Sequence, residues 1–149
     1  MQLAGKHIVN APPATVWAML MDTDTLARIV PGITRLEKIN DTNFKSILEI
    51  KLGPVNSSFT GSLQLENVVV QRGFTLRAQQ NSKIGNAGTA LKIGLSAVNG
   101  LQTEVVFDGD VRLSGLLATM GQRVMSGVAN ALSKQFFLNL ERELEKAKV

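Results

Sequence analysis

The sequence of 149 residues contains no cysteine and one histidine. Without thiols the chain can form no disulfide, no thiolate nucleophile and no zinc or iron–sulfur site built on sulfur ligands. A single imidazole, that of His7, cannot provide a cluster of histidine ligands and has no evident serine partner. The sequence therefore predicts no metal, no cofactor and no catalytic residue.

Long apolar runs are also missing. A membrane-spanning helix needs roughly 20 mostly apolar residues, and every apolar stretch here is interrupted earlier by a charge, a glycine or a proline. The N-terminus, residues 1–9, lacks the basic start, apolar centre and small-residue cleavage site of a secretory signal. We therefore expect a cytoplasmic protein.

Aromatic residues make up only 5% of the chain, with six Phe, one Trp and no Tyr. The net charge is +4, from 16 basic and 12 acidic residues, but the basic residues are scattered. Nucleic-acid binding usually requires a basic patch, often with aromatic stacking groups, so no nucleic-acid partner is expected. A core with few large rings is hard to fill completely, which slightly favours an internal cavity.

The N-terminal part of the chain predicts one strand followed by two short helices. Residues 2–10 read as a strand, and the prolines at positions 12 and 13 suit the first turn of a helix, where a missing N–H has no partner. Residues 22–30 begin with Asp and carry apolar residues on one side, which predicts a second helix that ends at Pro31.

From Ile33 to Leu113 apolar and polar residues alternate with the period of a β-strand. Turn residues interrupt the alternation, as at Gly53–Pro54 and at Asn99–Gly100, where both residues accept positive φ. This pattern predicts a meander of antiparallel strands with one apolar face. That face requires a cover.

The C-terminal segment, residues 115–146, contains no proline and predicts one long helix that supplies this cover. Its apolar residues recur at steps of three and four: Leu117, Met120, Val124, Val128, Leu132, Phe136, Leu140 and Leu144. Gly121 and Gly127 within this helix suggest a close approach of the sheet or of a ligand. Residues 1–149 are thus expected to form one α+β domain.

Several local strings cover nearly the whole chain in a characteristic order. They are Ala11-Pro12-Pro13 before Val16-Trp17, Pro31-Gly32, Gly53-Pro54-Val55 followed by Phe59 and Gly61, and Gly121-Gln122-Arg123 leading to Phe136-Phe137. Together with the order of elements, they resemble the carbon monoxide dehydrogenase G-subunit family of START-like proteins. The resemblance implies a helix-grip fold, in which a curved antiparallel sheet wraps around the long C-terminal helix.

The same resemblance implies a function. It suggests a non-enzymatic accessory protein that binds a quinone- or lipid-like small molecule in a cavity and assists a molybdenum-containing carbon monoxide dehydrogenase-type hydroxylase, with peripheral contact at the inner face of the membrane. Two alternatives remain open. One is a ligand-free adaptor for membrane recruitment or assembly of that enzyme, and the other is a START-like cyclase or hydrolase with an acid/base pair inside the cavity.

The expected cavity wall combines the apolar strand face with the helix stripe: Phe44, Leu48, Phe59, Leu63, Phe74, Leu76, Leu91, Ile93, Val105, Phe107, Met120, Val124 and Val128. Candidate polar contacts to a ligand are Arg123, Ser46, Ser57, Thr89 and Thr103, because they share the phase of apolar neighbours or lie beside the helix stripe. Asp108 and Asp110 fall on the opposite phase of their strand, which predicts a solvated face rather than an acid/base pair.

Overall fold

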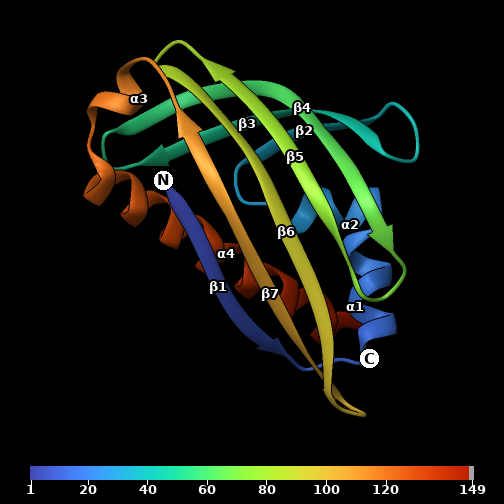
Figure 1. The fold of residues 1–149 in the computed structure, drawn as a ribbon. Coiled ribbons are helices and arrows are strands. Elements are labelled where there is room, and N and C mark those ends of the chain that lie inside the picture. The colour runs from blue at the N-terminus through green and yellow to red at the C-terminus, as the bar shows by residue number, and fades with distance from the viewer. Residues whose placement is uncertain (148–149) are drawn as a thin grey trace.

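An antiparallel sheet of seven strands curves around the long C-terminal helix in the computed structural model, which describes residues 1–147 (Figure 1). In chain order the elements are β1 (Gln2–Val9), α1 (Pro13–Leu20), α2 (Thr23–Ile29), β2 (Ile33–Lys38), β3 (Asn43–Leu52), β4 (Val55–Val69), β5 (Gly73–Ser82), β6 (Gly85–Asn99), β7 (Gln102–Leu113), α3 (Leu116–Thr119) and α4 (Gln122–Ala147). The strands lie in the order β1-β7-β6-β5-β4-β3-β2. The expected helix-grip arrangement is confirmed.

The two short helices begin where the sequence places their starts. Helix α1 has Pro13 in its first turn and buries Val16, Trp17 and Leu20. Helix α2 is capped by Asp22, whose Oδ2 accepts hydrogen bonds from the Thr25 hydroxyl at 2.6 Å and the Thr25 backbone N–H at 3.1 Å. These two bonds hold the pKa of Asp22 below its usual value, and the bond from the hydroxyl contributes most.

Strand register decides which side chains face α4. Phe107 of β7 pairs with Ile93 of β6, and Ile93 pairs with Phe74 of β5. All three contribute to a core that also contains residues of α4, so this is the concave face of the sheet. Successive residues of a strand point to opposite faces. Lys92 and Asp108 therefore lie on the convex face, where both are exposed.

The expectation of one helix over residues 115–146 is wrong, because the segment forms α3 and α4 with a break between them. Gly121, at the break, has a φ of +88°, which a continuous right-handed helix does not allow. Most of the predicted stripe holds within α4: Leu140 and Leu144 are buried, and Val128, Leu132 and Phe136 pack against the core. Met125 is buried, whereas Val124 is 38% exposed, so the prediction that Val124 faces the sheet is also wrong.

The two helix glycines do not mark a close approach, contrary to expectation. A Cβ built at Gly121 or Gly127 meets no atom within 4 Å outside the local helix backbone. Gly121 instead provides the positive φ of the break, and Gly127 occupies an exposed position inside α4.

Replacing Gly127 by alanine is therefore expected to stabilise the protein by about 0.5–1 kcal/mol, the difference in helix propensity between the two residues. Thermal unfolding followed by circular dichroism should show a rise in Tm of about 1–4 °C for a chain of this length. The matched control is Gly121→Ala, which is expected to lower Tm because alanine at a φ of +88° is strained. Equal shifts in both variants would contradict this assignment.

The core is divided into two apolar clusters towards opposite ends of α4. The α1 cluster contains Val9, Ala11, Val16, Trp17, Leu20, Ile29, Phe74, Leu95, Val105, Phe137, Leu140 and Leu144. The α3 cluster contains Ile50, Val55, Phe59, Leu117 and Met125. Figure 1 shows α1 and α2 near the C-terminal end of α4 and α3 near its N-terminal end. Buried apolar packing therefore joins helix and sheet at two separate places.

Candidate ligand chamber between the sheet and helix α4

The concave face carries small or polar side chains between the two clusters. One cross-strand row contains Ser46, Gly61, Gln80 and Ala87, and the adjacent row contains Ala78 and Thr89. We call these six residues the central rows. Protein interiors are otherwise packed like organic crystals. Glycine, alanine and serine in the middle of the curved sheet occupy less volume than the large residues of the two flanking clusters.

Helix α4 shows the same change of side-chain size along its length. Met125 and Phe137 are buried in the α3 and α1 clusters, respectively. Between them, at steps of four residues along the same stripe, are Ala129 and Ser133. Next to these two small residues, Val128 and Leu132 pack against the α3 cluster.

Apolar surface remains accessible beside the central rows. Leu63 and Leu91 are both on the concave face by register, are partly exposed, and belong to neither apolar cluster. A leucine that faces the covering helix of a well-packed domain is ordinarily buried. This accessible apolar surface, flanked by two packed clusters, is the geometry expected of a chamber for a hydrophobic ligand.

A buried polar pair crosses the sheet within the central rows. Gln80 Nε2 donates a hydrogen bond to Ser46 Oγ at 3.2 Å, and the Ser46 hydroxyl lies 3.5 Å from Gln80 Oε1. Ser46 is 2% exposed and Gln80 is 8% exposed. The two residues belong to β3 and β5, and Gly61 of β4 lies between them. A Cβ at Gly61 would lie 2.8 Å from the Gln80 amide carbon, so glycine is what allows the side chain of Gln80 to cross β4.

The residues expected to line the cavity occupy three kinds of position. Some are buried in or packed against the α1 cluster: Phe74, Leu76, Ile93, Val105 and Phe107. Others belong to or pack against the α3 cluster: Leu48, Phe59, Met120 and Val128. Phe44 is buried outside both clusters, Leu63 and Leu91 are partly exposed outside both clusters, and Val124 is exposed on α4.

The five candidate polar contacts differ in burial and in hydrogen-bond partner. Three hydroxyls donate to backbone carbonyl groups: Ser57 to Ser58 at 3.3 Å, Thr89 to Asp110 at 2.9 Å, and the fully buried Thr103 to Ala11 at 2.7 Å. Arg123 is exposed at the start of α4. Of the five candidates, only Ser46 is both buried and paired with another side chain.

Sequence reasoning missed Gln80 as a site residue. The signal was present, because Gln80 follows Phe74, Leu76 and Ala78 at intervals of two on the apolar face of β5. A long polar side chain at a position of the apolar face is the signal that would have identified Gln80. Its partner Ser46 and the glycine between them become evident only from the register of three strands.

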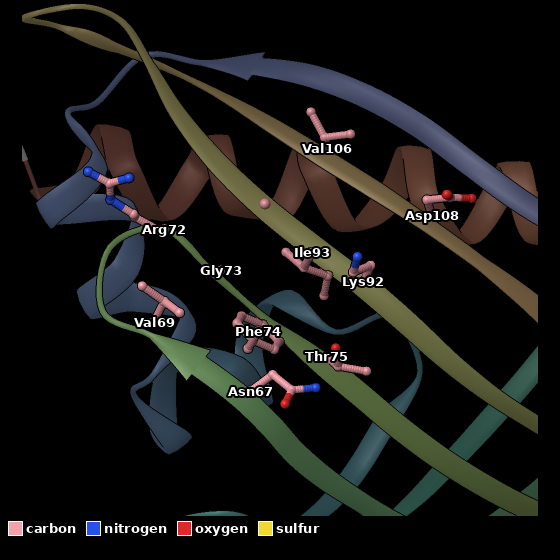
Figure 2. Close-up of a pocket in the computed structure, with 11 residues that line it drawn as sticks. Asn67, Val69, Arg72, Gly73, Phe74, Thr75, Lys92, Ile93, Val106 and Asp108 are labelled. Carbon is pink, nitrogen blue, oxygen red and sulfur yellow. The ribbon is translucent and has the colours of Figure 1, made fainter.

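A surface groove lies on the convex face, away from the central rows. It has a volume of about 660 Å³ and is lined by residues of β4 to β7 and the β4–β5 turn: Asn67, Val69, Arg72, Gly73, Phe74, Thr75, Lys92, Ile93, Gly94, Val106 and Asp108 (Figure 2). Figure 2 shows α4 on the far side of the sheet from this groove. The groove mixes exposed valines with a Lys92–Asp108 cross-strand pair.

The ionisable groups considered for catalysis lie outside the chamber. Asp110 binds the N-terminal ammonium at 3.1 Å, and Asp108 accepts a hydrogen bond from Gln2; both carboxylates are exposed, as predicted. His7 stacks on Phe137 with a centroid separation of 4.6 Å and lies 3.9 Å from Glu141. Within residues 1–147 no three His, Asp or Glu side chains gather as metal ligands, and no helix has the length and apolar character needed to cross a bilayer.

The fold is the helix grip of START-like proteins. A START superfamily protein from Mycobacterium smegmatis has a TM-score of 0.75 at 12% identity, with 98% of each chain covered. A conserved protein from Geobacillus kaustophilus has a TM-score of 0.95 at 23% identity, covering 99% of this chain and 97% of its own. The Zhui aromatase/cyclase from Streptomyces sp. R1128 has a TM-score of 0.73 at 15% identity, covering 100% and 96%, respectively.

Within this class the chain belongs to the carbon monoxide dehydrogenase G-subunit (CoxG) family, whose family model matches residues 5–145. The resemblance drawn from the sequence is confirmed. A comparison with curated protein sequences gives no match.

Proposed function

We propose that this protein binds a quinone- or lipid-like small molecule in the chamber over the central rows and serves as a non-enzymatic accessory protein of a molybdenum-containing carbon monoxide dehydrogenase-type hydroxylase. The observation that carries the ligand-binding part is the interruption of the core. The two packed clusters flank a part of the sheet that carries small or polar side chains, and Leu63 and Leu91 remain partly exposed there. Membership of the CoxG family supports the proposed partner.

The energetics favour an apolar occupant. Removing apolar surface from water stabilises a complex by about 25 cal/mol per Å². The surface of Leu63 and Leu91 is already arranged by the sheet, and the flanking clusters keep it in place. A preformed apolar site loses little conformational entropy when the ligand enters.

The polar groups beside the chamber support binding rather than acid/base chemistry. The buried polar residues of the described chain are Thr25, Ser46, Gln80 and Thr103, and none of them titrates near neutral pH. A cyclase or hydrolase reaction needs a group that gives or accepts a proton at the substrate. Ser46 and Gln80 can orient a ligand, but neither supplies such a group.

Peripheral contact with the inner face of the membrane is the second part of the proposal. It is supported by two turns at the same end of the sheet, those joining β4 to β5 and β6 to β7 (Figure 1). Both carry exposed apolar side chains: Val68, Val69, Val70, Val98 and Leu101, the last of them 76% exposed. Exposed apolar groups of this kind mark sites of protein or membrane contact. From the cytoplasm, such contact would give the chamber access to ligands dissolved in the bilayer.

The test is a substitution that fills the proposed chamber with a larger side chain. Leu63→Trp is expected to lower affinity for a long-chain quinone at least tenfold, because the indole would occupy the accessible space beside the central rows. Affinity is measured by titration of the purified protein, and native mass spectrometry of protein from cells should show a bound lipid-sized mass in the wild type. The matched control is Val124→Trp, on the exposed face of α4, which is expected to bind like the wild type.

The two alternatives give other results. A ligand-free adaptor would bind no quinone or lipid in either variant, yet would co-purify with the hydroxylase. Equal loss of affinity in both tryptophan variants would place the ligand outside the chamber. Conversion of a bound polyketide or ester by the isolated protein would favour the cyclase or hydrolase.

A further inference from the structure

The buried Ser46–Gln80 pair has no evident role in holding the fold together. Both side chains lie on the concave face of the sheet, and their only side-chain hydrogen bonds within the described residues are to each other. Replacing a buried polar pair of this kind by apolar groups of similar shape is commonly neutral for stability. The position of the pair, between the two apolar clusters and facing the chamber, therefore calls for another explanation.

The pair retains unused hydrogen-bonding capacity. A glutamine amide has two N–H groups, and only one of those of Gln80 donates, to Ser46. The second contact, from the Ser46 hydroxyl to Gln80 Oε1, is long at 3.5 Å. A ligand oxygen can thus accept from the free amide N–H, and a ligand hydroxyl can donate to Oε1, without the loss of a strong internal bond.

Charge is missing from the interior around the pair. None of the buried polar residues of the described chain is ionisable, so this interior offers no buried counter-charge. An ionised carboxylate or amine placed against Gln80 would lose its hydration without gaining an ion-pair partner. A neutral carbonyl or hydroxyl group would lose far less hydration free energy and would gain a hydrogen bond with the Gln80 amide.

We infer that Ser46 and Gln80 form a polar anchor that selects ligands with an apolar body and an uncharged carbonyl or hydroxyl group, and that rejects the ionised fatty acid of the same length. This inference rests on the proposed chamber. Gly61 is a positioning residue for the anchor, because it leaves the path by which Gln80 reaches Ser46 across β4.

The experiment compares three probes of equal carbon number: methyl octyl ketone, decane and decanoate. Each is titrated against wild-type protein loaded with Nile red, and displacement of the dye gives the affinity. The wild type is expected to prefer the ketone over decane and over decanoate by about tenfold, the effect of one hydrogen bond of ordinary net strength.

Gln80→Leu is expected to abolish the preference for the ketone over decane while both still displace the dye. Ser46→Ala, which removes only a hydroxyl, is expected to reduce the preference for the ketone over decane. If Gln80→Leu does not fold, this variant alone tests the role of the pair. Thr25→Val, which removes a buried hydroxyl of the α2 cap, should leave the preference at its wild-type value.

Two results would overturn the inference in different ways. If all three probes displace the dye equally from the wild type, or if Gln80→Leu keeps the tenfold preference, the proposed chamber is retained and the proposed role of Ser46 and Gln80 is wrong. If no probe displaces the dye and long-chain quinone also fails to bind, both the proposed chamber and the proposed polar anchor are wrong.

Discussion

Replacing Leu140 by alanine is expected to lower the free energy of unfolding by about 3–4 kcal/mol. Leu140 is 0% exposed and belongs to the α1 cluster, which joins the C-terminal half of α4 to the sheet and to α1. Truncation removes the transfer energy of the side chain and leaves a cavity that the surrounding strands and helices cannot close. A loss of this size is a large fraction of the stability of an ordinary domain.

The measurement is urea unfolding followed by circular dichroism, with Leu138→Ala as the control. Leu138 lies two positions earlier in the same helix but is 46% exposed, so its truncation should cost under about 1 kcal/mol. Similar losses in the two variants would mean that α4 presents a different face to the sheet. The same pair of variants also tests whether α4 is held at its C-terminal end.

Gly61→Ala is expected to destabilise the protein by about 2–3 kcal/mol, the cost of overpacking an interior position. The added methyl group would overlap the backbone carbonyl oxygen of Gln79 on β5 and lie 2.8 Å from the amide carbon of Gln80. Relief requires β4 and β5 to move apart at the point where the sheet carries its polar pair. Affinity for a chamber ligand should therefore fall together with stability.

Gly100→Ala is the control, because a Cβ at Gly100 meets no atom within 4 Å and the residue does not have a positive φ. Its unfolding free energy should stay within about 0.5 kcal/mol of the wild type. The double variant Gly61→Ala/Gln80→Ala should recover only part of the loss, because the overlap with the Gln79 carbonyl remains. Full recovery would show that the Gln80 side chain, rather than the backbone, sets the requirement for glycine.

The strands were predictable because alternation is a local property. Residues 43–52 form β3, as the spacing of Phe44, Leu48 and Ile50 indicates, and the Asn99–Gly100 hairpin is confirmed. The physical reason for that hairpin differs from the expected one. Neither residue adopts a positive φ, and the Asn99 side chain instead accepts a hydrogen bond from the Leu101 backbone N–H at 2.8 Å.

The break before α4 and the composition of the site were not predictable in the same way. The apolar pattern of the sequence continues through Gly121, but the positive φ of that glycine interrupts the helix, and in the first turn of α4 Met125 is buried instead of Val124. The Ser46–Gln80 pair depends on how β3, β4 and β5 align, which is long-range information. The resemblance to a family supplied the idea of a cavity, but not the residues that define it.

The pairing of β1 with β7 has a consequence for how the protein is made. Gln2 lies opposite Asp110, and the N-terminal ammonium binds the Asp110 carboxylate. Ribosomes add about 5–20 residues per second. Strand β1 is synthesised roughly 100 residues before β7, its neighbour in the described sheet, so at this rate it waits roughly 5–20 seconds for that neighbour. During that interval the apolar side chains of β1 have no native partner strand, and the nascent chain depends on chaperones or on its own transient contacts to remain unaggregated.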